Sequence, residues 1–394
     1  MIYVDNAATT KMSRVAIETQ LACMTNTFAN PSSLHGMGQE AAEVLESARG
    51  DIARHINADA KEIIFTSGGS ESDNQAILSA AMAGERAGKK HIVSTAIEHH
   101  AVLHTLDKLE KRGFDITLVP VHENGIVVFD EIVAALREDT CLVSVMYANN
   151  EIGTIQPIAE IGALCREKEI LFHTDAVQAV GHVPIDVKAL KIDLLSLSAH
   201  KFHGPKGVGA LYARRGIRLT NLIEGGAQEG GKHAGTQDVP SILSMAAALE
   251  ESCTQMESRN FKLIELRDLL IAGLQQIPHS VLNGDVTRRL SGNVSFCFEG
   301  IEGESMLLML SERGIYASSG SACTSGSLEP SHVLLAIGRP HEVAHGSLRL
   351  TLSHENTHEE IHQIIQAVTE VVSTLRGMSP LWRDLQEGKR EHVL

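Results

Sequence analysis

The feature that most constrains the fold is a series of short apolar segments, rich in β-branched residues and mostly separated by stretches long enough for a helix. These segments are 61–69, 91–99, 115–121, 140–149, 169–177, 192–201 and 208–214. Nearly continuous apolar strands that alternate with helices indicate a mostly parallel sheet covered on both faces. We therefore expect an α/β fold whose sheet is flanked by helices.

Polar residues gather at the ends of five of these predicted strands, at 67–72, 98–100, 148–151, 173–178 and 198–201. In sheets of this type, ligands bind at the carboxyl ends of the strands. The clusters therefore predict one binding site at this edge of the sheet.

The pattern changes in the last third of the chain. A helical pattern begins near Pro240, runs past Leu270 and is predicted to be a connector, after which 291–300 and 346–353 are predicted strands. We expect a second, smaller α+β domain from about residue 259. The final stretch, 384–394, is polar and is predicted to be a mobile tail.

Charge and composition exclude several classes of protein. The formal net charge of -15 argues against nucleic acid or an anionic membrane as the main partner. We find neither an apolar run of about 18 residues nor the pattern of a signal peptide at the start. The six cysteines are scattered without a CxxC pair, which is typical of a reducing compartment. We expect a cytoplasmic protein.

The segment 65–77 is predicted to be a strand, a Gly68-Gly69 turn and the start of a helix. Backbone N–H groups at such a helix start bind phosphate, and Ser70 adds a hydroxyl. The segment matches neither GxGxxG nor GxSxG, which disfavours a dinucleotide site and a nucleophile elbow. An ordinary strand-to-helix turn remains the alternative.

Two other strand ends carry groups that need partners. Asp175 is predicted to be a buried acid, with Gln178 three residues later. It would pair with a protonated ring nitrogen or with a structural cation. His99 and His100 would stack on a cofactor ring, bind zinc or serve a structural role, although no paired spacing supports a metal.

Lys201 and Lys206 lie five residues apart, in different contexts. Lys201 directly follows a predicted buried strand, whereas Lys206 lies in a Gly-rich turn. A lysine that forms a Schiff base must be held rigidly and be partly desolvated, which favours Lys201. Ser198 and His200 flank it within reach of a phosphate. The pattern GxxxxGK[ST] of a P-loop is absent.

Cys323 lies in a run of Gly, Ser and Thr, whereas Cys141 and Cys297 lie among apolar residues. This context favours a reactive thiol. A chance exposed cysteine is the alternative.

Taken together, these residues resemble the NifS/IscS-type cysteine desulfurases, in the class V aminotransferase group of pyridoxal 5'-phosphate (PLP) enzymes. The resemblance covers almost the whole chain. Its motifs are YVDNAATT, NPSSLHGMG, FTSGGSESDN, EHHAV, NNEIGTIQP, HTDAVQAVG, SLSAHKFHGPKGVGALY, GTQDVP, SSGSACTSG and GMSPLW.

The resemblance implies PLP fold type I, with a large PLP-binding domain at 13–258 and a small domain made of 1–12 and 259–394. It implies conversion of L-cysteine to L-alanine, with a persulfide on Cys323 that passes to an acceptor for Fe–S cluster assembly or tRNA thiolation. It also implies a homodimer and an Fe–S scaffold or other sulfur acceptor as partner. No resident metal is expected, although Cys323 could ligate an Fe–S cluster transiently.

The resemblance also implies roles for single residues. Lys201 would form the Schiff base. The PLP ring would be held by His99, Asn150, Asp175 and Gln178. The phosphate would be held by Gly69, Ser70, Ser198, His200 and, from the other subunit, Thr236. The substrate carboxylate would be held by Asn30 and Arg349, because a guanidinium fork suits a carboxylate.

The sequence departs from the family at one segment. The family usually has QERGxRxGT, whereas this chain has Gly230 and His233 at the two arginine positions. The effect of this change on the site shared by two subunits is left open. A selenocysteine lyase, a transaminase and a non-catalytic docking protein are the alternative functions, and neither of the last two needs an accessible thiol such as Cys323.

Overall fold

The computed structural model describes residues 1–320 and 330–394. Its largest element is a seven-stranded sheet with the strand order β2-β8-β7-β6-β5-β3-β4. In that order, the strands are Ile63–Thr66, Gly209–Ala213, Leu194–Ser198, Leu171–Asp175, Thr140–Ser144, His91–Thr95 and Asp115–Val119. Strand β8 is antiparallel to both neighbours, and the other neighbouring pairs are parallel. The mostly parallel α/β sheet predicted from the sequence is confirmed.

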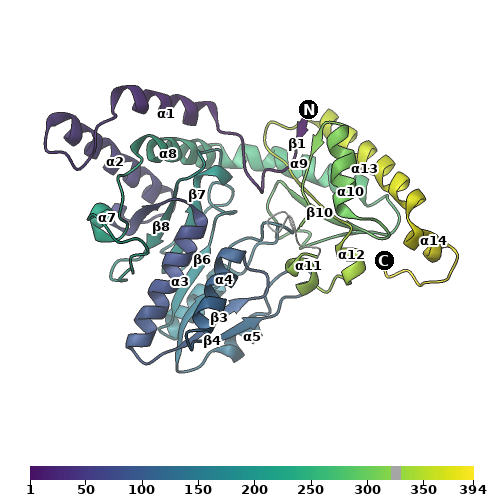
Figure 1. Ribbon diagram of the computed structural model, residues 1–394, viewed down its shortest axis with the longest axis horizontal. Helices are drawn as coiled ribbons and strands as arrows, with labels where there is room; N and C mark the ends of the chain where they lie inside the picture. The colour runs from purple at the N-terminus through teal and green to yellow at the C-terminus, as the bar shows by residue number, and fades with distance from the viewer. Residues whose placement is uncertain (321–329) are drawn as a thin grey trace.

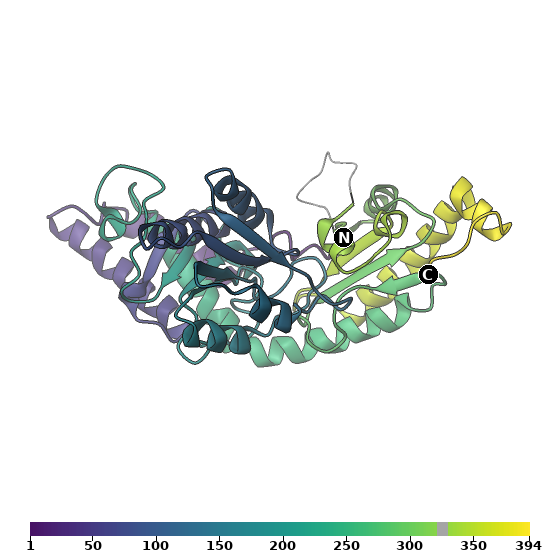
Figure 2. The same ribbon diagram turned by 90° about the horizontal axis from the view of Figure 1, so that it is seen from below.

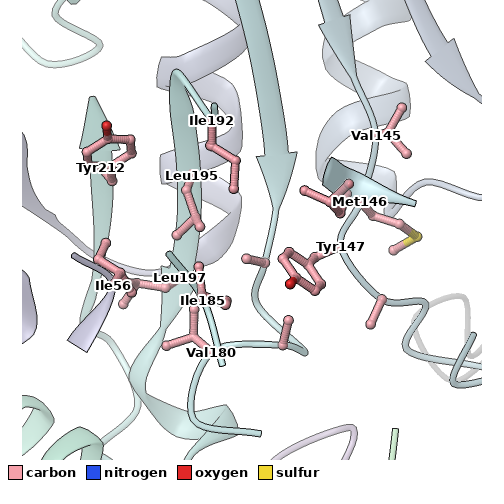
Figure 3. Close-up of a cluster of buried hydrophobic side chains, with 14 of the residues drawn as sticks. Ile56, Val145, Met146, Tyr147, Val180, Ile185, Ile192, Leu195, Leu197 and Tyr212 are labelled. Atoms are coloured by element: carbon pink, nitrogen blue, oxygen red, sulfur yellow. The ribbon is translucent and has the colours of Figure 1, made fainter. Parts of the chain in front are cut away.

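Successive residues of these strands face opposite sides of the sheet, as the two-residue period of a strand requires. In β7, Leu195 and Leu197 pack in one buried cluster, whereas Leu194 packs in another. Figure 3 shows part of the first cluster, where Leu195 and Leu197 meet Ile56 and Val180. Both faces are therefore hydrophobic, which explains why the strands are apolar along their whole length.

Helices cover both faces of this sheet (Figure 1). The buried residues of α3 (Gly69–Arg86) and α4 (His100–Glu110) belong to the cluster on one face. The cluster on the other face includes residues of the following helices: α1 (Arg14–Asn26), α2 (Gly36–His55), α5 (Phe129–Ala135), α6 (Ile158–Glu167) and α8 (Val239–Thr254). The short helix α7 (Gln228–Gly231) lies in the connection between β8 and α8.

The predicted connector is two helices. Helix α8 begins at Val239, where the Asp238 side chain caps it by accepting from Ser241 N at 3.1 Å, and it ends at Thr254. Helix α9 (Met256–Leu274) follows after Gln255 and runs from one lobe of the molecule to the other (Figure 2).

The second lobe has a three-stranded antiparallel sheet in the order β12-β10-β9. Its strands are β9 (Ser280–Leu282), β10 (Asn293–Phe298) and β12 (Ser347–Thr351). It is covered by α9, α10 (Gly303–Glu312) and α13 (His358–Met378), and one buried cluster joins them. Strands β1 (Ile2–Tyr3) and β11 (Ile315–Tyr316) form a parallel pair. Three shorter helices complete this part of the chain: α11 (His332–Ala336), α12 (His341–Ala344) and α14 (Pro380–Gln386).

The end of the chain differs from the mobile tail that we expected. After α14 the chain folds back onto the second lobe, where the carboxylate of Glu299 accepts from Val393 N at 2.8 Å and contacts His392 Nδ1 at 2.7 Å. His279 Nδ1 contacts Leu394 O at 2.9 Å. The buried carboxylate of Glu299 holds His392 and Val393 in place, a contact that the sequence pattern does not reveal. Among the described residues, no helix is long and apolar enough to cross a membrane.

Candidate active site

A cavity of about 300 Å³ lies at the carboxyl ends of the parallel strands. It brings together most of the site residues predicted from the sequence. These are Gly69, Ser70, His99, Asn150, Asp175, Gln178, Ser198, His200, Lys201 and Arg349. The convergence of polar strand ends that the sequence predicts is therefore present in the fold.

Three predicted residues do not line this cavity. Asn30 is exposed in the loop before α2, where its Oδ1 accepts from Ser32 N at 2.8 Å. Thr236 is exposed just before α8. Cys323 lies outside the described residues.

Lys201 follows β7 and points toward the N-terminal segment of the chain. Its Nζ donates to Ala8 O at 2.8 Å and to Ala7 O. Gln178 Nε2 donates to the same Ala7 carbonyl at 2.9 Å. Lys206, in contrast, is exposed. The backbone therefore holds Lys201 inside the cavity, as expected for a lysine that reacts there.

Two buried carboxyl groups line the cavity. Asp175 lies at the end of β6, where its Oδ1 accepts from Val177 N at 2.9 Å. Asp73 lies in the first turns of α3, and its Oδ1 has no hydrogen-bond partner among the described residues. Burial raises the pKa of both groups, and the negative charge of Asp175 raises the pKa of Asp73 further. A cation bound in the cavity would relieve this cost.

Two histidines border the same space. His99 is the N-cap of α4, where its Nδ1 accepts from Ala101 N at 3.1 Å. A neutral ring with this bond carries its proton on Nε2. Burial, followed by the charge of Lys201, lowers the pKa of His200 to about 4, so this ring is neutral at physiological pH. His100 lies outside the cavity and contacts His104 and His332, with ring centroids 5.0 and 4.9 Å away.

The start of α3 is built to accept an anion. Gly68 has a φ of 150°, and a side chain at Gly69 would place Cβ 2.5 Å from Val177 Cγ2. No side chain caps the helix, so its first N–H groups remain available beside Ser70 and Ser198. The phosphate interpretation of this turn is therefore favoured over an ordinary turn.

Arg349 enters the cavity from β12 of the second lobe. It is 2% exposed, and its Nη2 donates to Asp5 Oδ1 at 2.9 Å while its Nη1 donates to Asn150 O at 3.2 Å. Its Nε has no hydrogen-bond partner among the described residues. A buried guanidinium with an unused donor is suited to bind a carboxylate.

The sequence reasoning missed residues that hold the predicted ones in place or line the cavity with them. Asp5, Ala7 and Ala8 hold Arg349 and Lys201, and Asp73 lies beside Asp175. The motif DNAATT was the only signal for the first three, and its carbonyl oxygens cannot be recognised from side-chain chemistry. Asp73 lies inside a helix, away from the strand ends that we searched.

The segment that departs from the family has a defined structure. Glu229, Gly230 and Gly231 are left-handed, with φ of 51°, 64° and 78°. Glu229 pairs with buried Arg49 at 2.6 Å, and His233 Nε2 lies 2.8 Å from Glu71 Oε1 in the first turn of α3. The replacement residues thus fit the turn, and His233 keeps it beside the start of α3.

Comparison with known proteins identifies the family. The model of the family described as "Aminotransferase class-V" matches residues 2–364. The chain belongs to the class-V aminotransferase family. This class-V chain is 54% identical to cysteine desulfurase IscS of Methanosarcina thermophila over 380 residues, covering 96% of this chain and 94% of the relative. It is 52% identical to cysteine desulfurase IscS of Clostridium botulinum (strain Kyoto / Type A2) over 393 residues, covering 99% of each.

A solved structure named NifS-like protein has the same fold. It superposes with a TM-score of 0.89 at 38% identity and covers 95% of this class-V chain and 100% of its own. The likeness confirms the expected PLP fold type I. The cofactor of this class-V enzyme is PLP.

The residues present fit this cofactor. PLP carries a phosphate, an aldehyde and a ring nitrogen that becomes cationic, and the cavity offers an uncapped helix start, a lysine and a buried carboxylate. Asp73 Oδ1 and Arg349 Nε, which have no hydrogen-bond partner among the described residues, also point to a ligand.

Proposed function

We propose that this chain is a PLP-dependent cysteine desulfurase that uses Cys323 as its sulfur acceptor. One observation carries the proposal: Lys201, Asp175 and Arg349 line a single cavity. Relatives at 54% and 52% identity are named cysteine desulfurase IscS. In the reaction, the Cβ–S bond of L-cysteine breaks and an S–S bond forms on Cys323, which gives L-alanine and a cysteine persulfide.

The proposed roles follow from the positions of the side chains. Gly69, Ser70, Ser198 and His200 would hold the phosphate. His99, Asn150, Asp175 and Gln178 would hold the ring. PLP, when bound, withdraws electrons from the substrate α-carbon and so acidifies its proton.

The chain's own groups would do the rest. Asp175 would keep its carboxylate beside the ring nitrogen and favour the protonated form of that nitrogen. Lys201 Nζ would take the α-proton and return a proton later, as general base and acid. Arg349, with Asn30, would hold the substrate carboxylate so that the α-carbon faces Lys201. Thiolate on Cys323 would then attack the substrate sulfur.

We also propose a homodimer, in which Thr236 of one copy contacts the phosphate held by the other. Apolar side chains exposed on α1 and in the loop after it support this proposal, among them Leu21 at 60% and Phe28 at 68% exposure. An exposed apolar surface of this kind is typical of an interface. Asn30 lies in the same loop and would reach the substrate across that interface.

We also propose a domain division, a cellular location and a partner. The two-domain division at 13–258 and at 1–12 with 259–394 is supported by the separate buried cluster of the second lobe. A cytoplasmic location is supported by the free thiols of the five described cysteines. An Fe–S scaffold or another sulfur-accepting protein is the proposed partner, and labelled persulfide sulfur that moves to it would identify it.

A lysine pair gives the sharpest test of the proposed function. Purified protein with PLP and L-cysteine should form alanine and, with a reductant, sulfide. Lys201→Ala should lower alanine formation by at least about 1,000-fold and remove the visible absorbance of the bound cofactor. Lys206→Ala, five residues later and exposed, should leave both within about twofold. A cofactor band that survives in Lys201→Ala would disprove the assignment.

A second pair tests the sulfur acceptor. Cys323→Ser should stop alanine formation when no reductant is present, whereas Cys253→Ser should not. Burial raises the pKa of Cys253 to about 11, which makes it a suitable unreactive control. Unchanged alanine formation in Cys323→Ser would contradict the persulfide step. Comparison of L-cysteine with L-selenocysteine would separate a desulfurase from a selenocysteine lyase.

A further inference from the structure

Glu151 is a buried carboxyl group that the proposed chemistry does not use. It lies in the turn after β5 and is 5% exposed. Asn149 Oδ1 accepts from Glu151 N at 2.8 Å and from Ile152 N at 3.0 Å, and Asn149 Nδ2 donates to Ile97 O at 3.0 Å. These bonds fix the backbone of the turn and therefore the direction of the Glu151 side chain.

The carboxylate contacts the chain that follows residues 321–329. Ser331 Oγ donates to Glu151 Oε2 at 2.5 Å. The same hydroxyl accepts from Val333 N at 3.1 Å and from Leu334 N at 3.3 Å, which caps α11. A hydroxyl group has one proton to donate and two lone pairs that accept. Ser331 Oγ therefore donates to Glu151 and accepts from the two backbone N–H groups.

The same oxygen lies beside the chain that precedes residues 321–329. A Cβ added at Gly320 would lie 2.6 Å from Glu151 Oε2, so a larger residue at this position would require the Glu151 carboxyl group to shift. Two residues earlier, Ser318 pairs with Arg349: Arg349 N donates to Ser318 O at 2.7 Å, and Ser318 N donates to Arg349 O at 3.2 Å. One carboxyl group therefore accepts a hydrogen bond from the chain after the segment that contains Cys323 and lies beside the chain before it.

Glu151 is also connected to the cavity. Its neighbour Asn150 lines the cavity and accepts from Arg349 Nη1 at 3.2 Å. Burial raises the pKa of Glu151 to about 7, although the hydrogen bond from Ser331 and the charges of Arg349 and His99 act to lower it. The carboxyl group therefore lies close enough to the proposed substrate-binding arginine to feel its charge, beside Gly320 and hydrogen-bonded to Ser331.

We propose that Glu151 is a positioning residue that ties Gly320 and Ser331 to the cavity wall formed by Asn150 and Arg349. The inference rests on the proposed function, in which Cys323 collects sulfur at this cavity. Three residues of chain span at most about 11 Å. Because Gly320 is three residues before Cys323, the place where Gly320 is held limits how far any path of the chain can carry the thiol.

The kinetic test uses two changes at one position. In the PLP-loaded enzyme, Glu151→Ala should lower kcat for alanine formation at least about tenfold, while KM for L-cysteine changes less than about threefold. A general loss of structure would instead lower PLP content and raise KM. Glu151→Gln keeps the shape and an acceptor oxygen, so it should restore most of kcat. Glu160→Ala, at an exposed position of α6, is the matched control and should behave as wild type.

The second readout needs no catalysis. In PLP-free protein, hydrogen exchange in a peptide that covers 330–337 should be faster in Glu151→Ala than in wild type, because Ser331 loses its partner. Glu151→Gln and Glu160→Ala should exchange like wild type. This measurement still decides the anchoring if wild type makes no alanine, so failure of the proposed function and failure of this inference are distinguishable.

A double variant tests whether Glu151 and Ser331 act through one contact. Ser331→Ala removes the other half of the contact, so the double variant with Glu151→Ala should lose no more kcat than Glu151→Ala alone. Additive losses would overturn the proposal, as would wild-type kcat or unchanged exchange in Glu151→Ala. If Glu151→Ala does not fold, Ser331→Ala decides: it should show the same kcat loss, and wild-type kcat would overturn the proposal.

Discussion

At the scale of single residues, the site depends on carboxyl groups that are costly to bury. Glu98 is fully buried next to His99, and its Oε1 accepts from Thr95 Oγ1 at 2.6 Å and from Met146 N at 2.9 Å. Its Oε2 has no hydrogen-bond partner among the described residues. Burial, with a smaller effect of Asp175, raises the pKa of Glu98 to about 8.

This shift predicts how stability depends on pH. Between pH 4.5 and 8 the unfolded chain loses the proton of Glu98 while the folded chain keeps it, so the free energy of unfolding falls as pH rises. The loss is on the order of a few kcal/mol. The side chain in Glu98→Gln cannot ionise, so this variant should not show the loss of unfolding free energy. The melting temperature of the variant minus that of wild type should therefore increase from pH 5 to pH 8, by calorimetry, and a constant difference would contradict this.

Single residues also show where sequence reasoning ends. Lys201, Asp175 and His99 were predictable because each lies at or shortly after the carboxyl end of a strand in a mostly parallel sheet, and such ends meet. The role of Asp5 was not predictable, because it comes from a contact with Arg349, 344 positions away. Glu151 lies in the predicted polar cluster at 148–151, but its hydrogen bond from Ser331, 180 positions away, was not predictable.

At the scale of elements, the start of α3 decides how closely an anion can approach. Gly69→Ala would bring a methyl group to 2.5 Å from Val177 Cγ2, so the helix start must shift. We expect the dissociation constant for PLP to rise at least about tenfold, measured by absorbance titration. Gly50→Ala in α2 is the control, because nothing lies within 4 Å of its added Cβ.

The Gly50→Ala control should also stabilise the protein. Alanine in the interior of a helix is more favourable than glycine by roughly 0.5–1 kcal/mol. Gly50→Ala should therefore raise the melting temperature and leave PLP binding unchanged. Equal losses of PLP affinity in both variants would show that the helix start of α3 is not special.

The strands were the most predictable elements, because burial on both faces makes each one apolar throughout. The break at Gln255 between α8 and α9 was not predictable, since neither proline nor glycine marks it. The return of residues 392–394 to Glu299 was equally hidden, because it depends on a carboxylate almost a hundred residues away.

At the scale of the whole molecule, the proposed homodimer makes a prediction about assembly. Leu21→Glu and Phe28→Glu place charges on the exposed apolar surface of α1 and the loop after it. Light scattering should then show a shift from dimer to monomer, and PLP affinity should fall because Thr236 is no longer supplied by the second copy. Leu308→Glu is the control, at 70% exposure on α10 of the other lobe. A monomeric wild type would disprove the dimer directly.

The N-terminal segment joins the two lobes at the site. Ala7 N donates to Thr351 Oγ1 at 2.8 Å, and the carbonyl groups of Ala7 and Ala8 accept from Lys201. A ribosome makes Ala7 344 residues before Thr351, so the pairing must wait until Thr351 has been made. During synthesis, a chain that already contains Lys201 therefore lacks the surroundings that hold its amine. Cofactor capture thus becomes an event that follows translation, and truncated products should leave the ribosome without PLP.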